Sequence, residues 1–176
     1  GVEGANRFVQ RVWRIIGEVA EELKNVKPKP ATEGEGLVAS KAAHKTLKAV
    51  QEDLDKLAFN KAIARIHEFV NALATHLASL SADSDPSLKA AGHEALTILV
   101  KLIAPMMPHL AQECWQVLGH RGFVAAEGWP TIDQSLLVDE EVTLPIQING
   151  KKRGDLTVPA TASKADIEKA ALESDV

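Results

Sequence analysis

FNKAIARIHEFVNALATHLASL, residues 59–80, carries an apolar side chain at every third or fourth position along one stripe. The stripe consists of Ile63, Ile66, Val70, Leu73, Leu77 and Leu80. This period matches the 3.6-residue turn of an α-helix and predicts an amphipathic helix, which we expect Asn60 to cap at its start. Such a helix has to bury its apolar face against other elements, so the stretch predicts a helical bundle.

The segments before this stretch repeat the pattern. They predict helices over about residues 6–25 and 38–57, separated by the Pro- and Gly-rich loop KNVKPKPATEGEG. The apolar stripes are Phe8, Val12, Ile15, Val19 and Leu23 in the first helix, and Leu47, Val50, Leu54 and Leu57 in the second. Trp13 also falls within a helical pattern, and we expect it to lie in the core.

Two further helices are predicted downstream. Asp85 suits an N-cap and Pro86 suits the first helical position, so a fourth helix should run from there to about Ala104. Pro108 can open a fifth helix, which Gly119 closes as a C-terminal cap. Trp115 lies on this fifth helix, on an apolar face, and we expect its side chain to be buried.

The pattern changes after Gly119. Residues 120–140 show no period and predict an extended connector. Beyond them the apolar positions alternate, as in β-strands: Val142, Leu144, Ile146, Ile148, Leu156 and Val158. Asn149-Gly150 lies between the two runs and predicts a hairpin.

The numbering of these apolar positions constrains the hairpin register. All of them are even-numbered, so a two-residue loop, which pairs Ile148 with Lys151, would place the two apolar stripes on opposite faces. We therefore expect a loop with an odd number of residues and Gly150 in a left-handed bulge. Ser163 and Asp166 then have the spacing of a capping box for a last helix.

These patterns predict a mainly α fold. It consists of a bundle of about five helices over residues 1–119, a connector over 120–140, and a β-hairpin with one helix over 141–176, which we interpret as an incomplete α/β module. The hydrophobic share of 45% is enough for a packed core.

Charge and cysteine content narrow the function classes. The net charge of −4 argues against a general polyanion binder, but residues 1–48 carry nine basic and six acidic side chains, so a local basic face is expected. One cysteine excludes an internal disulfide and fits a cytoplasmic setting. The N-terminus lacks the features of a signal peptide and begins with glycine, which suggests a piece of a longer protein, and no run reaches the ~20 apolar residues that span a bilayer.

Several segments together resemble bacterial leucyl-tRNA synthetases. The segments are GVEGANRFVQRVW at the start of the chain, FNKAIARIHEFVNAL, LIAPMMPHLAQECWQVLG followed by GWP, and QINGKKRG in the hairpin. The APxxPHLAxExW pattern is shared with the valine, isoleucine and methionine enzymes, so the equivalent domain of one of these is the first alternative. GVEGANRF and QINGKKRG favour the leucine enzyme.

The resemblance implies a fold of the class I synthetase anticodon-binding type and a role in holding tRNA(Leu). It also implies that ATP and magnesium serve the parent enzyme elsewhere, because this chain contains neither a HIGH-like nor a KMSKS-like segment. We therefore expect no catalytic residue, cofactor or metal here. The expected partners are tRNA(Leu) and the catalytic and editing domains of a monomeric, cytoplasmic parent, without reliance on the anticodon bases.

Three basic clusters are the candidate tRNA-binding residues: Arg7, Arg11 and Arg14; Lys41, Lys45 and Lys48, with His44 beside them; and Lys151, Lys152 and Arg153. The first two have helical spacing, and the third lies beside the expected turn. Such clusters can neutralise RNA phosphates. The alternatives are solvated, ion-paired helix faces, a charged strand edge, and a helical protein-interaction module that binds no RNA.

Other reactive side chains have simpler explanations. His67-Glu68 and His93-Glu94 begin like the zinc motif HExxH, but the second histidine is replaced by Asn71 and Thr97. Cys114 has no base near it in sequence, and we expect a buried structural thiol.

Overall fold

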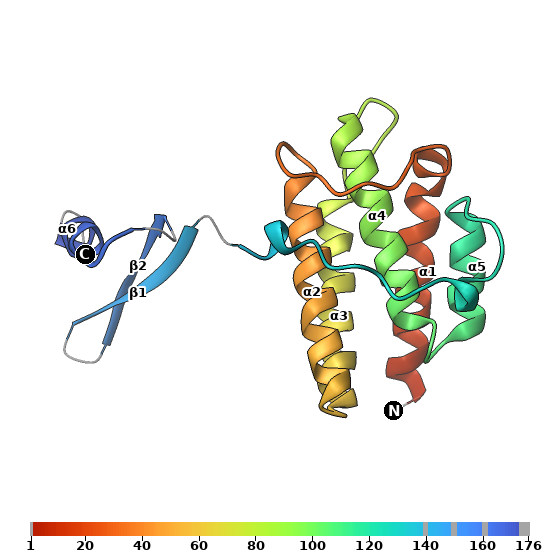
Figure 1. The fold of residues 1–176 in the computed structure, drawn as a ribbon, viewed down its shortest axis with the longest axis horizontal. Helices are drawn as coiled ribbons and strands as arrows, with labels where there is room; N and C mark the ends of the chain where they lie inside the picture. The colour runs from red at the N-terminus through yellow and green to blue at the C-terminus, as the bar shows by residue number, and fades with distance from the viewer. Residues whose placement is uncertain (1, 139–140, 149–150, 160–161, 173–176) are drawn as a thin grey trace. The chain divides into compact units, whose positions relative to one another are not determined.

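A computed structural model describes residues 2–138, 141–148, 151–159 and 162–172 of the chain (Figure 1). Its elements, in chain order, are α1 (Val2–Leu23), α2 (Leu37–Asp55), α3 (Phe59–His76), α4 (Pro86–Ile103), α5 (Pro108–Val117), the 3-10 turns η1 (Val124–Ala126) and η2 (Gln134–Leu137), β1 (Glu141–Ile148), β2 (Lys151–Pro159) and α6 (Lys164–Leu172). The five-helix bundle and the hairpin with its helix are thus confirmed. The chain forms two compact units, residues 1–137 and 138–176.

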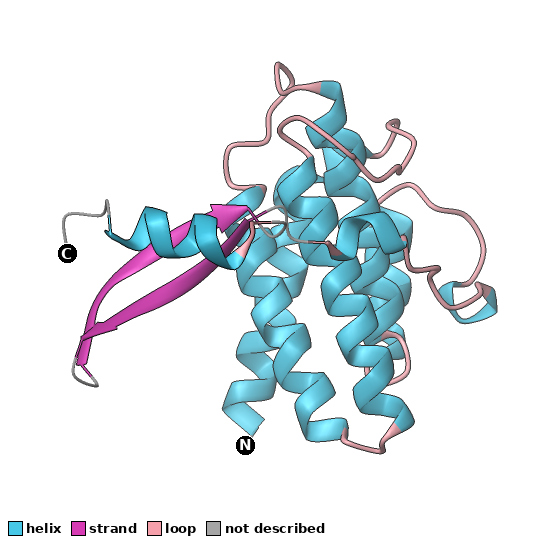
Figure 2. Ribbon diagram, turned by 60° about the vertical axis from the view of Figure 1, so that its left-hand side comes forward, coloured by secondary structure: helices cyan, strands magenta, loops and turns pink. Residues whose placement is uncertain are grey.

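The five helices of the first unit alternate in direction, as Figures 1 and 2 show. α3 packs on α1, α2 and α4, while α5 packs on α1 and α4. The predicted stripe of α1 is confirmed, because all five of its residues are buried in the core. No helix among the described residues is long and apolar enough to cross a membrane.

Four predictions about single side chains are wrong. Trp13 is 43% exposed because it lies about 100° around the helix from the buried Val12. Ile63 is 39% exposed, and α3 buries Ala62 and Phe69 instead. Leu57 is 73% exposed because α2 ends before it. The N-cap of α3 is Ala58, which makes no side-chain cap, so Asn60 has no capping role.

Two predicted helix caps, one at a helix start and one at a helix end, are confirmed. Asp85 caps α4, because its Oδ1 accepts a hydrogen bond of 2.7 Å from the Ser87 amide. Gly119 follows α5 with a φ of +89°, and a Cβ there would lie 2.7 Å from the Lys24 carbonyl oxygen. Glycine is therefore required at position 119 for two reasons: the left-handed backbone conformation and the close approach of the chain after α1.

The hairpin keeps its even-numbered apolar residues on one face, but in a way that the sequence did not indicate. Val142 pairs with Val158 and Leu144 with Leu156, so the apolar stripes share a face. Ile148 nevertheless pairs with Lys151 across a two-residue loop, which makes the expectation of an odd loop wrong. The register shifts inside the strands instead, where β2 has one extra residue, Arg153, between its pairs with Gln147 and Ile146. The loop residues 149–150, on which the expected Gly150 bulge falls, lie outside the described residues.

The last helix begins as predicted. The Asp166 amide donates to Ser163 Oγ (3.3 Å), and the Ser163 amide donates to Asp166 Oδ2 (3.2 Å), which is a capping box. α6 contacts β2 and buries none of its own residues, so this second unit has little core of its own within its described part.

Residues 120–137 belong to the same compact unit as the five helices. Trp115 is 4% exposed, and its Nε1 donates to the Arg121 carbonyl over 3.1 Å. The Trp115 ring stacks on His120 with centroids 3.9 Å apart. Because the Thr97 hydroxyl donates to the His93 carbonyl, Thr97 Oγ1 accepts from His120 Nε2 at 2.9 Å. Trp115 on α5 and Thr97 on α4 thus hold the start of this segment on the bundle.

Trp115→Ala should lower the free energy of unfolding by about 3–5 kcal/mol, because a large buried ring is removed and a cavity remains. Urea unfolding followed by circular dichroism measures this change. Trp13→Ala, which removes the same ring from an exposed site, should cost less than about 1 kcal/mol. Equal losses in the two variants would contradict the burial difference.

Stability should fall as the pH drops from about 6.5 to 4. Burial, with His93 and Lys101 nearby, lowers the pKa of His120 to about 4, and burial also lowers the pKa of His93. In that window the unfolded chain takes up protons that the folded chain does not, so each histidine lowers the unfolding free energy by at most about 1.4 kcal/mol per pH unit. Denaturant midpoints across this range should decline less steeply for His120→Gln than for the unmodified chain. Equal slopes of midpoint against pH for the two proteins would contradict the low pKa of His120.

Candidate nucleic-acid interface

The three candidate arginines of α1 are all exposed. Arg14 Nε lies 3.8 Å from Glu18 Oε1, an exposed pair one turn apart that contributes little to stability. Arg7 and Arg11 make no ion pair or hydrogen bond with any residue that the structure describes. Their guanidinium groups are therefore available for a ligand.

Arg7 and Arg11 line a groove of about 340 Å³ between α1 and α3, the α1–α3 groove. α3 contributes His67 and Asn71 to it, and the His67 ring packs against Phe8 with centroids 4.1 Å apart. None of the described residues that line this groove is acidic. Two unpaired guanidinium groups beside a histidine and an amide form a suitable site for the phosphates of a nucleic-acid backbone.

The candidate lysines of α2 are less available. Lys41 and Lys45 are half-buried, and Lys48 is exposed with its Nζ 3.9 Å from Glu52 Oε1. Glu52 therefore partly compensates the charge of Lys48, although a solvated pair one helical turn apart contributes little to stability. The sequence spacing of the three lysines is thus confirmed as helical, but their environments differ.

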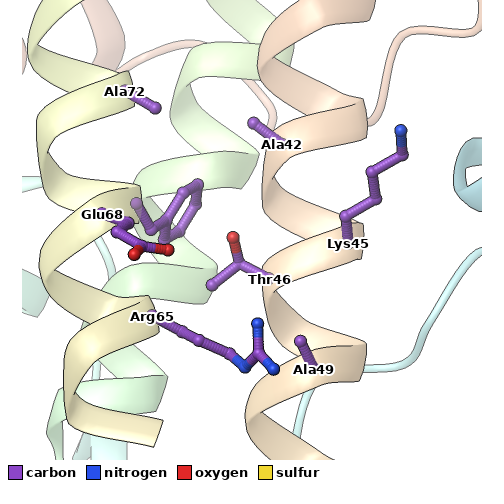
Figure 3. Close-up of a pocket in the computed structure, with 8 residues that line it drawn as sticks. Ala42, Lys45, Thr46, Ala49, Arg65, Glu68 and Ala72 are labelled. Atoms are coloured by element: carbon purple, nitrogen blue, oxygen red, sulfur yellow. The ribbon is translucent and has the colours of Figure 1, made fainter. Parts of the chain in front are cut away.

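Lys45 lines a second groove, of about 360 Å³, between α2 and α3 (Figure 3). Its other lining residues are Ala42, Thr46, Ala49, Arg65, Glu68, Phe69 and Ala72. Arg65 reaches from α3 toward α2, and its Nε donates to Asp53 Oδ2 at 2.5 Å. This hydrogen bond and the Asp53 charge raise the pKa of Arg65. With Arg65 already paired and Glu68 on the wall, this groove is less positive than the α1–α3 groove.

The arginines of α1 and the lysines of α2 lie on helices across the bundle from each other. α1 packs on α3, α4 and α5, whereas α2 packs on α3, α4 and η2. α3 lies between α1 and α2, and a groove runs along each of its sides. Arg7 and Arg11 are thus brought together with His67, and Lys45 with Arg65, but the two complete basic stripes share no single face.

His44 does not accompany the lysines at the surface, and the expectation that it would is wrong. It is 2% exposed, with Nε2 2.9 Å from Glu94 Oε1. The amide of Asp133 donates to His44 Nδ1 over 3.0 Å, so Nε2 carries the proton that is donated to Glu94. This histidine holds the segment before η2 on the bundle and does not face a ligand.

Lys151, Lys152 and Arg153 are the first three residues of β2, next to the loop of the hairpin. Their side chains lie outside the part of the chain that the structure describes. Their RNA contact stays a prediction.

The remaining reactive side chains form no site among the described residues. Cys114 is fully buried, and burial, with a contribution from Glu113, raises the pKa of its thiol to about 12. The expectation of a buried structural thiol is confirmed. Groups of three or more His, Cys, Asp or Glu residues with metal-site geometry do not occur in the described ranges.

The sequence patterns did not indicate the contribution of α3 to the α1–α3 groove. In the sequence, His67 stands out as the start of a zinc-like motif, and Asn71 as the residue that breaks it. Their spacing of four residues places both on one side of α3, which was a usable signal. The identity of the helix they face was not in the sequence.

The chain is similar in sequence to a part of several tRNA ligases. The family model described as the anticodon-binding domain of tRNA ligase matches residues 38–169. A leucine–tRNA ligase of Agrobacterium fabrum is 66% identical over 99% of this chain, and one of Sinorhizobium fredii is 58% identical over the same share. The chain spans 20% of the length of each of these relatives.

A solved structure has the same fold. It is a LeuRS of Agrobacterium radiobacter K84 in a ternary complex with tRNA and LeuAMS. The similarity has a TM-score of 0.79 at 29% identity and covers 97% of this chain and 21% of that one.

Proposed function

The chain belongs to the anticodon-binding domain family of tRNA ligases, and we propose that it is the tRNA-binding C-terminal portion of a leucine–tRNA ligase. The identity of 66% to a leucine–tRNA ligase favours leucine over the valine, isoleucine and methionine alternatives. The known complex of a similar chain with tRNA supports RNA as the partner. Activity, substrate and cytoplasmic location of the whole protein remain part of the proposal, because the chain spans a fifth of its relatives' length.

The observation that carries the proposal is the α1–α3 groove. Arg7 and Arg11 lie there exposed, without an acidic neighbour in the lining and without an ion pair to a described residue. The phosphate backbone of tRNA(Leu) would lie along this groove, where each guanidinium replaces bound counterions. Lys45 and Arg65, on the other side of α3, would contribute a weaker contact, because Arg65 is already paired with Asp53.

The adenylate chemistry of the ligase would belong to its catalytic domain. ATP would be held there with magnesium, and the lining of the α1–α3 groove does not fit that metal. Magnesium prefers carboxylate oxygens, whereas the walls of the α1–α3 groove are basic or neutral. The role of this chain would be to position tRNA(Leu).

Replacing both groove arginines, Arg7→Gln with Arg11→Gln, should weaken tRNA(Leu) binding about tenfold or more, because two charge-assisted contacts are lost. The slope of log affinity against log salt should flatten by about 0.7–0.9 for each lost phosphate contact. Fluorescence anisotropy at several salt concentrations measures both. Lys41→Gln with Lys48→Gln removes the same charge from α2 and serves as the matched control. Equal effects of the two double variants would mean that only net charge matters.

The hairpin cluster can be tested independently. Replacing Lys151, Lys152 and Arg153 together by glutamine should reduce tRNA affinity and flatten its salt dependence, again by about 0.7–0.9 per contact. None of the three is among the apolar residues of the strands, so their replacement removes no apolar side chain. An unchanged salt slope in this triple variant would show that the cluster does not touch phosphate.

A further inference from the structure

The exposed face of α1 has a hollow of about 710 Å³, larger than either groove beside α3. We call it the Trp13 hollow, and its lining residues are Asn6, Arg7, Gln10, Arg11, Trp13 and Arg14. Arg7 and Arg11 line the α1–α3 groove as well, so their side chains stand between that groove and Trp13. A ligand whose phosphates lie on these two arginines therefore has room for a neighbouring group in the hollow.

The indole of Trp13 has no partner in the part of the chain that the structure describes. It is 43% exposed, whereas the ring of Trp115 is buried, stacks on His120 and donates its N–H to the Arg121 carbonyl. No described residue accepts a hydrogen bond from Trp13 Nε1, and no described ring or cation lies against its face. Leaving so large an apolar ring in water is unfavourable. An unpartnered indole among polar and basic side chains is suited to a flat ligand.

Gly17, which follows Trp13 by one helical turn, is not required by the fold. It lies in the interior of α1, where glycine destabilises a helix relative to alanine. Its backbone is not left-handed, and a Cβ there would meet nothing within 4 Å apart from its chain neighbours and the local helix backbone. Side chains of a helix lean toward its N-terminus, so a longer side chain at position 17 would lean over the Trp13 ring. Gly17 therefore keeps this side of the ring open.

We propose that Trp13 is the platform on which an unpaired base of the tRNA stacks, next to phosphates held by Arg7 and Arg11. This inference rests on the proposed function and adds a base contact to it. Proteins that bind RNA outside its duplexes stack unpaired bases on aromatic rings and hold the adjoining backbone with basic side chains. Gln10, in the same hollow, has an amide that can donate to and accept from the edge of a base. The lining thus offers groups for both the base and the phosphate of a nucleotide.

The charge of the Trp13 hollow favours a nucleic acid over a protein partner. Three of its six lining residues are arginines, and none is acidic. Glu18, one turn beyond the hollow, pairs with Arg14 and leaves the charges of Arg7 and Arg11 uncompensated by any described residue. A protein surface that filled the hollow would have to place carboxylates around a flat apolar group. A nucleotide carries a negative charge and a flat ring in one unit.

Trp13→Ala should weaken tRNA(Leu) binding about 5- to 150-fold, because one stacked base is lost. The slope of log affinity against log salt should stay the same, because no phosphate contact is removed; this separates Trp13→Ala from the double arginine variant. Trp13→Phe should keep most of the affinity, whereas Trp13→Leu, which is apolar but has no ring, should not. Trp129→Ala removes an equally exposed ring (41%) from the segment after α5 and should bind like the unmodified chain. Fluorescence anisotropy measures the affinities, and urea midpoints check that each variant is folded.

A long RNA duplex, poly(A)·poly(U), separates base stacking from backbone contact, because it offers phosphates with few unpaired bases. Trp13→Ala and the unmodified chain should bind it equally. An equal loss of affinity for the duplex and for tRNA(Leu) would overturn the proposal, as would unchanged affinity of Trp13→Ala for tRNA(Leu). Salt-dependent tRNA binding in the latter case would leave the proposed function intact and reject the stacking alone. An unmodified chain that binds no tRNA would reject both.

Substitutions at Gly17 should separate stability from binding. Gly17→Ala and Gly17→Gln should both raise the melting temperature by about 2–4 °C, because each removes a glycine from the interior of a helix. Only Gly17→Gln should weaken tRNA(Leu) binding, by about fivefold or more, because its longer side chain covers the Trp13 ring. In a Trp13→Ala background Gly17→Gln should have no further effect on affinity. Equal affinities of the two Gly17 variants, or losses that add in the double variant, would overturn the assignment of this side of the ring to a base.

Discussion

The packing of α3 between α1 and α2 is the contact on which the rest of the first unit depends. α3 buries Ala62, Ile66, Phe69, Val70 and Leu73 against its neighbours, and this wide buried arc fixes its rotation. Its two flanks then become the walls of two grooves, with His67 on the side of α1 and Arg65 on the side of α2. The same placement separates the two basic stripes, because α1 and α2 can no longer be neighbours. The difference in charge between the grooves follows from it.

The second constraint is the attachment of residues 120–137 to the bundle. Two polar clusters hold this segment: Trp115 with His120 at its start, and His44 with Glu94 and the Asp133 amide near its end. The buried His44 and the half-buried His120, hydrogen-bonded in this way, keep the loop in place without an apolar run of its own. The position at which the chain leaves the bundle for the second unit is thereby set by side chains on α2 and α4, far away in the sequence.

Local strain is distributed unevenly over the bundle. Gly119 occupies a left-handed position where glycine is required, and it lets the chain approach the carbonyl of Lys24. Leu57 occupies an equivalent helix-ending position without that freedom. The two ends of the bundle thus end a helix with the same left-handed backbone conformation, at Gly119 in one case and at Leu57 in the other.

The amino-acid sequence by itself determined the number and order of the helices and several of their starts and stops. These depend on interactions within one or two turns: the 3.6-residue period of α1, the Asp85 cap of α4, and the capping box of Ser163 and Asp166. It also determined that the hairpin must keep its apolar positions on one face, although not that a bulge at Arg153 would achieve this. The basic clusters that motivate the tRNA proposal were likewise visible as patterns.

Only the tertiary structure decided which of those side chains meet. Trp13 and Ile63 fit helical patterns but lie outside the buried arcs, because burial depends on where a neighbouring helix lies and not on the period alone. His44 became a buried link because Glu94 and Asp133, 50 and 89 residues away, converge on it. Arg7 and Arg11 line a groove without acidic residues because α3 supplies His67 and Asn71 to its other wall. Contacts of this kind join residues distant in sequence, and no local pattern encodes them.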